Sequence, residues 1–254
     1  MVQKNLVFPL VFSLLKNPWF LDIYILLKQF ISHISLMAEL LEVYDLQNNF
    51  LGVQDRKEFY KEIWAEHKET GKITRKVKTI RLFLMTSEWR IYIQERSRYK
   101  DGNPWMYDKT IWGHVTANDS FHMTMMKESV EEMWVSSVIL TDQEFLQATK
   151  VVDLSVIGLL RAVAYVPNFM SVKTTLEWNW IEQPQMTTIY AGYYDGAIRF
   201  KDGECVGIRV FSMDELKEEI KRDPSKFTED IKYMVEKYGS YLLSVKDLLE
   251  EASS

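Results

Sequence analysis

The chain has 254 residues, of which 47% are hydrophobic and 26% charged, an ordinary globular composition that excludes a disordered chain. Since a domain takes roughly 100 to 200 residues, this length predicts one large domain or one domain with an appendage. The net charge of -5 excludes a bulk nucleic-acid binder, whose affinity rests on excess Lys and Arg. The single cysteine, Cys205, excludes an internal disulfide and a cysteine-rich metal site, and it indicates a reducing, cytoplasmic compartment.

The first 36 residues are apolar but interrupted by charges. No run in them reaches the ~20 apolar residues of a membrane span, so no transmembrane segment is predicted. No small-residue cleavage site follows Lys4, which disfavours a cleaved signal peptide. Two interpretations remain for residues 1–36: an amphipathic helix on the domain or on a membrane surface, or a dispensable extension upstream of a working start at Met37. The globular pattern begins at Met37, so we expect the domain to span residues 37–254.

From Met37 onward, the hydrophobic periodicity predicts a mixture of strands and helices. Strands are predicted at residues 40–46, 51–53, 76–84, 90–94, 135–140, 161–165, 188–194 and 207–211. Helices are predicted at residues 56–69, 120–133, 213–221 and 229–250, with Ser212 and Thr228 as N-caps of the last two. A turn at residues 86–88 indicates a hairpin, and residues 97–108 a loop. This alternation predicts a layered α/β domain.

The segment from Gly113 to Val135 contains a predicted amphipathic helix. On a helical wheel with roughly 100° between successive residues, an arc of apolar side chains lies opposite three glutamates. The arc comprises Met123, Met126, Val130 and Met133, and the glutamates are Glu128, Glu131 and Glu132. Like charges at spacings i, i+3 and i+4 repel one another, whereas a hard divalent cation would bind the converging carboxylates. A solvated acidic helix face is the alternative interpretation.

This segment resembles the Nudix box, the motif GX5EX7REUXEEXGU, in which U is a bulky apolar residue. Gly113 begins the motif, and the remaining positions follow without a gap: Asp119, Lys127, Glu128, Ser129, Glu131, Glu132, Trp134 and Val135. Flanking stretches, among them Ile91–Ser97 and Val210–Leu216, are similar to the branch of the family close to isopentenyl-diphosphate isomerase. The resemblance covers roughly Met37 to Tyr241.

Four positions depart from the motif: Asp119 replaces Glu, Lys127 replaces Arg, Ser129 replaces the apolar residue and Trp134 replaces Gly. Because Asp119 and Lys127 keep opposite charges, we expect them to pair, without the bidentate fork of Arg. The family's Gly forms a tight turn after the helix, and a Trp at positive φ would cost about 1 to 2 kcal/mol. We therefore expect the turn at Trp134 to be built differently.

The resemblance implies a Nudix-type α/β/α sandwich with a mixed sheet and C-terminal helices. It implies a Mg²⁺-dependent hydrolase, a pyrophosphohydrolase that cleaves the diphosphate linkage of a small nucleoside diphosphate derivative. Glu128, Glu131 and Glu132 would be the metal ligands and catalytic residues, with Mn²⁺ as an alternative ion. Gly113, Asp119 and Lys127 would hold the motif together.

Outside the motif, the candidates rest on weaker signals. Arg96 and Lys100 are predicted to bind phosphate oxygens of the substrate. The general base has no distinctive signature, and the candidate carboxylates are Glu182, Asp195 and Glu204. Three aromatic side chains would stack on a base or anchor loops: Trp105, Tyr107 and Trp112. His114 and His122 are interpreted as structural, and residues 182–194 would line either the substrate pocket or a homodimer interface.

Two other functions stay open as alternatives. The first is a catalytically inactive, nucleotide-sensing Nudix module, which the Ser129 and Trp134 departures favour and the intact glutamates disfavour. The second is an isopentenyl-diphosphate isomerase-like enzyme. That chemistry needs a cysteine beside the Trp-Gly-His stretch, and no cysteine precedes His114, so the isomerase is the less favoured of the two.

Overall fold

The computed structural model describes residues 39–100, 102–174, 180–199, 205–242 and 250. By its internal contacts the chain divides into two units, Met1–Glu39 and Leu40–Ser254, and every element named here belongs to the second. The predictions for residues 1–36 and for a start at Met37 lie outside the described residues. No helix in the described part of the chain is long and apolar enough to cross a membrane.

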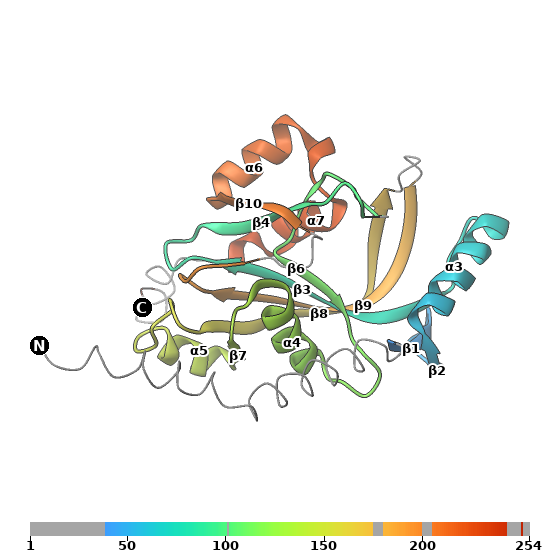
Figure 1. Ribbon diagram of the computed structural model, residues 1–254, viewed down its shortest axis with the longest axis horizontal. Helices are drawn as coiled ribbons and strands as arrows, with labels where there is room; N and C mark the ends of the chain where they lie inside the picture. The colour runs from blue at the N-terminus through green and yellow to red at the C-terminus, as the bar shows by residue number, and fades with distance from the viewer. Residues whose placement is uncertain (1–38, 101, 175–179, 200–204, 243–249, 251–254) are drawn as a thin grey trace, which may run out of the picture. The chain divides into compact units, whose positions relative to one another are not determined.

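One mixed sheet organises the domain (Figure 1), with the central strand order β10-β4-β3-β9-β8-β7. Strands β3 and β9 are parallel, as are β7 and β8, whereas the other neighbours along this order are antiparallel. The strands are β1 Leu40–Asp45, β2 Phe50–Asp55, β3 Arg75–Met85, β4 Ile91–Arg96, β5 Tyr107–Asp108, β6 Ile111–His114, β7 Ser137–Ile139, β8 Gly158–Thr174, β9 Trp180–Tyr193 and β10 Cys205–Phe211.

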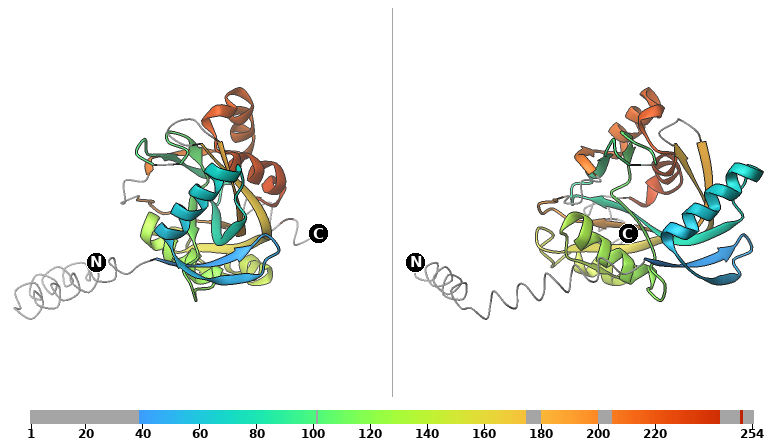
Figure 2. Two further views of the ribbon diagram at one scale, coloured as in Figure 1. Left: turned by 90° about the vertical axis from the view of Figure 1, so that its right-hand side faces the viewer. Right: turned by 45° about the vertical axis from the view of Figure 1, so that its right-hand side comes forward.

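Helices pack on both faces of this sheet. Figures 1 and 2 show α4 on one side and α6 with α7 on the other. The helices are α3 Arg56–Thr70, α4 Phe121–Met133, α5 Asp142–Ala148, α6 Met213–Arg222 and α7 Glu229–Tyr238, with 3-10 turns at Pro224–Lys226 and Gly239–Tyr241. Sequence signals set several ends: Asp55 caps α3, Gly71 ends it in the left-handed region, and Ser212 forms a capping box on α6.

Strand β3 shows how the two faces differ, because its side chains alternate between them. On the α4 face, Ile80, Leu82 and Leu84 pack with methionines of α4. On the opposite face, Val77 packs with α3 at one end, and Phe83 packs with α7 at the other. Between these two apolar clusters the same face carries the fully buried polar side chains of Thr79 and Arg81. The central strand therefore separates an apolar core from a partly polar one.

Most predicted elements are present, but several differ from the prediction. Residues 76–94 do not form the predicted two-stranded hairpin. Strands β3 and β4 are adjacent only beside the turn, where Met85 pairs with Ile91. The last predicted helix ends at Tyr238, and residues 243–249 of that prediction lie outside the described residues. Helix α5 was not predicted. Strands β8 and β9 extend well beyond their predicted bounds, with Pro167 accommodated at a bulge between Val166 and Phe169.

The predicted apolar arc of α4 is wrong. Met123 and Val130 are 47% and 49% exposed. The face that packs on the sheet carries Thr124, Met125, Ser129 and Met133. The hydrophobic periodicity predicted the wrong buried face because two polar residues, Thr124 and Ser129, occupy core positions. The most hydrophobic side of the helix is therefore not its buried side.

Candidate active site

The predicted motif folds as a strand, a loop and a helix. Gly113 lies in β6, and Ser120 caps α4 by accepting a hydrogen bond from the Met123 N–H at 3.1 Å. The Lys127 ammonium lies 2.7 Å from the Asp119 carboxylate, so the expected pair forms between the loop and the helix. The carboxylate of Asp119 is 15% exposed, whereas Lys127 is 51% exposed, so the pair is only partly shielded from water.

Gly113 leaves room for a glutamate. A Cβ atom at position 113 would lie 2.5 Å from Glu128 Oε1 and 2.8 Å from Glu128 Cδ, closer than real Cβ atoms approach other atoms. The absence of a side chain on β6 therefore creates a cradle in which the carboxylate of Glu128 rests against the strand. This contact gives the motif's first glycine a steric role, because any larger residue would displace the first of the three glutamates.

The three glutamates share one side of α4. Glu128 and Glu132 are half-buried and Glu131 is exposed. Within the described residues no three His, Cys, Asp or Glu side chains are gathered closely enough to hold a metal ion. By donor chemistry the set fits a hard divalent cation, since carboxylate oxygens are the ligands that Mg²⁺ and Mn²⁺ prefer. The cradle at Gly113 supports that fit for Glu128, because it positions one carboxylate beside the strand.

The structure accounts for Ser129 at a bulky apolar position. Ser129 is 1% exposed, and its hydroxyl donates to the Met125 carbonyl at 2.7 Å, one turn earlier in the helix. The buried hydroxyl therefore has a partner, which removes most of the cost of placing it in the core. The departure leaves α4 continuous through the motif.

Trp134 corrects an expectation about the turn after α4. We expected a different turn there, yet Trp134 adopts the left-handed conformation, with φ 61° and ψ 30°. Its N–H donates to the Val130 carbonyl at 3.1 Å, and the Val135 N–H donates to the Ser129 carbonyl at 3.0 Å. The orphan carbonyls at the helix end are thus satisfied as they would be with glycine. The chain keeps the motif's backbone and accepts the strain of a Trp in this region.

The predicted phosphate-binding residues lie in a loop that Arg96 ties together. Its guanidinium donates to the Gly102 carbonyl at 2.8 Å and to Asp108 at 3.3 Å. Lys100 is half-buried in the same loop. These contacts give Arg96 a structural role, and phosphate binding by Arg96 and Lys100 stays a prediction.

The structure describes two of the three candidate bases. Asp195 accepts from the Ser87 N–H at 2.8 Å and so fixes the turn between β3 and β4. Glu182 is exposed on β9, and Glu204 lies outside the described residues. The general base stays a prediction, either one of the three motif glutamates or one of these three carboxylates.

The histidines and aromatic residues beside the motif have protein partners. His114 Nε2 lies 2.6 Å from the Tyr60 hydroxyl, and burial holds the pKa of His114 well below its usual value. His122 Nδ1 lies 2.7 Å from the Tyr190 hydroxyl. The structural interpretation of both histidines agrees with these contacts. Of the aromatic candidates, Tyr107 packs against Phe227, Trp112 packs edge-on against His114, and Trp105 is exposed.

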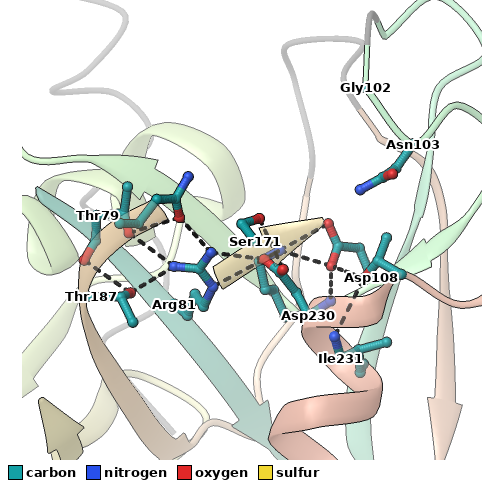
Figure 3. Close-up of polar contacts among 12 residues, drawn as sticks. Thr79, Arg81, Gly102, Asn103, Asp108, Ser171, Thr187, Asp230 and Ile231 are labelled. Carbon is teal, nitrogen blue, oxygen red and sulfur yellow. Dashed lines mark hydrogen bonds and ion pairs between the residues drawn. The ribbon is translucent and has the colours of Figure 1, made fainter. Parts of the chain in front are cut away.

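A buried ionic network was not predicted from the sequence. Arg81 is fully buried on the face of β3 away from α4, and its guanidinium binds the Asp230 carboxylate of α7 at 2.8 and 3.0 Å (Figure 3). It also donates to Thr187 at 2.7 Å and to Gln185 at 2.6 Å. These residues are far apart in sequence, and the only signal was a charged residue between the apolar residues Ile80 and Leu82 of β3.

Asp230 connects this network to the loop before β6. It accepts from Lys109 at 3.0 Å and from the Ser171 hydroxyl at 2.9 Å, as Figure 3 shows for Ser171. Burial alone would raise the pKa of Asp230, but Arg81 and Lys109 outweigh it and hold that pKa well below the usual value. Asp108 extends the network through Lys109 and the Thr228 hydroxyl. Helix α7 is thus bonded to β3, to β5 and to the loop that precedes β6.

Comparisons with known proteins identify the fold. No protein-family model and no curated protein matches the sequence. Among solved structures, that of DR0079 from Deinococcus radiodurans matches with a TM-score of 0.52 and 16% identity, over 78% of this chain and 98% of that chain. At this identity the match shows the fold alone, and it extends over almost the whole of the Deinococcus protein.

Looser matches include two structures with named activities. A bifunctional NMN adenylyltransferase/ADP ribose pyrophosphatase from Francisella tularensis has a TM-score of 0.42 and 13% identity, over 71% of this chain and 46% of that one. A MutT NUDIX hydrolase from Burkholderia pseudomallei has a TM-score of 0.39 and 11% identity, over 63% and 96%. The chain has a Nudix-type fold: a mixed sheet between helices, with the motif on a strand, loop and helix. The predicted fold class is thereby confirmed.

Proposed function

We propose that this protein is a Mg²⁺-dependent Nudix hydrolase that cleaves the diphosphate linkage of a small nucleoside diphosphate derivative. The observation that carries the proposal is the cradle at Gly113, which receives Glu128 in the arrangement that the motif requires. Two further observations support it. The Asp119–Lys127 pair joins the loop to the helix, and the turn at Trp134 keeps the glycine-type backbone despite its side chain.

Glu128, Glu131 and Glu132 would hold the metal. When bound, Mg²⁺ or Mn²⁺ would neutralise phosphate charge and lower the pKa of the attacking water. The chain's own contribution is positional. Glu128 rests against β6 at Gly113, whereas the side chain of Glu131 is exposed to solvent. Arg96 and Lys100 are proposed to receive phosphate oxygens, and a reducing, cytoplasmic location fits the single cysteine.

The test is hydrolysis of a panel of nucleoside diphosphate derivatives with and without Mg²⁺. Glu128→Gln, Glu131→Gln and Glu132→Gln should each lower turnover by about 100-fold or more, as expected when a group that stabilises the transition state is removed. Glu218→Gln, which changes an exposed glutamate on α6, is the matched control and should leave turnover unchanged.

Two results would overturn the proposal. Turnover that persists in all three variants would show that the three glutamates do not take part in the hydrolysis. Absence of turnover on every panel member, combined with nucleotide binding that needs no Mg²⁺, would favour the inactive sensing module instead.

A further inference from the structure

Lys173 of β8 is a lysine whose ammonium has no polar protein partner among the described residues. Its Nζ lies 5.2 Å from the centre of the Tyr60 ring and 5.0 Å from that of Trp112. Ring faces attract a cation but do not replace the three acceptors that an ammonium binds in water. Lys173 is half-buried, and an ammonium that loses part of its hydration costs free energy unless another group accepts its hydrogen bonds.

Two fully buried amides on the neighbouring strand β9 also have unsatisfied atoms. Gln183 and Gln185 are both 0% exposed, and Gln183 Oε1 and Gln185 Nε2 have no hydrogen-bond partner among the described residues. The other atom of each amide is engaged. Gln183 Nε2 donates to the Tyr60 hydroxyl at 3.1 Å, and Gln185 Oε1 accepts from Arg81 at 2.6 Å. Buried amides of this kind are rarely left half-satisfied.

The strand register places these groups on one face. On β9, Gln183 and Gln185 are two residues apart, so their side chains point the same way. On β8, Ser171 lies opposite Gln183, and Lys173 lies two residues further along the same face. On β6, Trp112 lies opposite Arg81, on the side of the sheet away from Gly113 and Glu128. The cluster is therefore separated from the three glutamates by the sheet.

The charges on this face are unbalanced. Four cationic side chains, Arg81, Arg96, Lys109 and Lys173, share two carboxylates, Asp108 and Asp230. Burial and the neighbouring cations lower the pKa of Lys173 to about 7, although Asp230 opposes the shift. An anion beside Lys173 would supply the missing negative charge.

We propose that Lys173, Gln183 and Gln185, with the rings of Tyr60 and Trp112, bind an oxyanion that also carries a hydroxyl group. The oxyanion oxygens would accept from Lys173 Nζ and Gln185 Nε2, and the hydroxyl would donate to Gln183 Oε1. A monoprotonated phosphate and a 2-hydroxycarboxylate share this chemistry. The site is distinct from the glutamates of α4 and does not depend on the proposed hydrolysis.

The test is calorimetric titration of the full chain with inorganic phosphate, lactate and acetate in the absence of divalent metal. Binding of phosphate or of lactate is expected, and whichever binds identifies the source of the oxyanion. Acetate, which lacks the hydroxyl, should bind about tenfold more weakly than lactate. Lys173→Met should weaken binding by at least about tenfold, whereas Lys150→Met, an exposed control, and Glu131→Gln should leave it unchanged.

A stability measurement keeps the test decisive. Because Lys173 has no acceptor to lose among the residues that the structure describes, Lys173→Met should have a Tm equal to or above that of the parent. Failure of the parent to bind phosphate and lactate would overturn the proposal, as would binding that survives Lys173→Met. A Tm well below the parent's, or a variant that does not fold, would also overturn it, because it would show that the ammonium has a structural partner.

Discussion

Gly113 and Glu128 are in such close contact that a single methyl group on the strand would overlap the carboxylate on the helix: the added Cβ would lie 2.5 Å from Glu128 Oε1. The two residues come from different elements, β6 and α4, and their contact sets where the first glutamate of the motif can lie.

Gly113→Ala should therefore impair activity without unfolding the domain. The backbone of Gly113 is ordinary strand, which alanine tolerates, so the strain falls on the Glu128 side chain. A displacement of this size should lower turnover by roughly 100-fold. Gly207→Ala is the control, since its Cβ would meet Glu95 only at 3.7 Å. Equal activities of the two variants, measured at equal Tm, would show that the cradle does not position Glu128.

Trp134 offers a test of backbone strain at the end of α4. Trp134→Gly and Trp134→Ala both remove the indole, so their difference isolates the cost of a Cβ at φ 61°. The glycine variant should be more stable by about 1 kcal/mol in urea denaturation. In an ordinary helical conformation the order would reverse, because alanine favours helix. Alanine as the more stable variant would therefore contradict the left-handed conformation.

The Arg81–Asp230 pair predicts a specific acid sensitivity. In an unfolded chain an Asp has a pKa of about 3.9. In the folded protein Arg81 and Lys109 hold the pKa of Asp230 lower, so its stabilisation is complete above the unfolded value and is lost as pH falls through the folded one. Stability should decline below about pH 4, and Asp230→Asn should make that decline shallower.

Asp230→Asn should also be less stable at neutral pH by roughly 3 to 5 kcal/mol, because it leaves Arg81 buried without its counter-charge. Urea denaturation at several pH values measures both effects. The exposed Asp214→Asn serves as control and should change neither the neutral stability nor the acid slope appreciably. A parallel acid decline in Asp230→Asn and the parent would exclude Asp230 as its source.

Lys76 is fully buried and forms no ion pair with a carboxylate in the described part of the chain, and neutral oxygens surround its ammonium. Its ammonium donates to the Leu46 carbonyl at 3.2 Å, Asn48 Oδ1 at 2.6 Å, and the Pro167 carbonyl at 3.0 Å. These acceptors come from the β1–β2 turn and the bulge in β8, so Lys76 joins two distant loops. Lys76→Met should cost on the order of 3 kcal/mol, since the acceptors lose their donor. Exposed Lys72→Met is the control, and comparable Tm losses in both variants would refute the role of Lys76.

Elements whose burial follows local periodicity could be predicted from the sequence. The long helix after Asp55 and the strand at residues 76–84 have strong patterns and clear ends, and both are present as α3 and β3. The resemblance of the segment around Gly113 to the Nudix box implied the fold class. The same resemblance, together with the opposite charges at the two positions, predicted the Asp119–Lys127 pair.

Features that depend on tertiary partners could not be predicted in this way. The buried side of α4 contains Thr124 and Ser129, and local hydrophobicity has no means of assigning polar residues to a core. The partner of Arg81 lies 149 positions away at Asp230, and no pattern within β3 identifies it. Strands β8 and β9 continue past Pro167 and Pro184 because each strand supplies the other with hydrogen bonds over a long antiparallel ladder.

The parallel pairing of β3 with β9 has a consequence for how the chain is made. Thr79 and Thr187 are neighbours in space but 108 positions apart, so the central strand β3 emerges from the ribosome long before its partner β9 is made. Asp230, the carboxylate partner of Arg81, is made later still, because it lies on α7. We therefore expect the segment that carries the three glutamates to become stable only after β9 has been made. The domain must complete its sheet after translation of β9, and a nascent chain truncated before that point exposes an aggregation-prone strand.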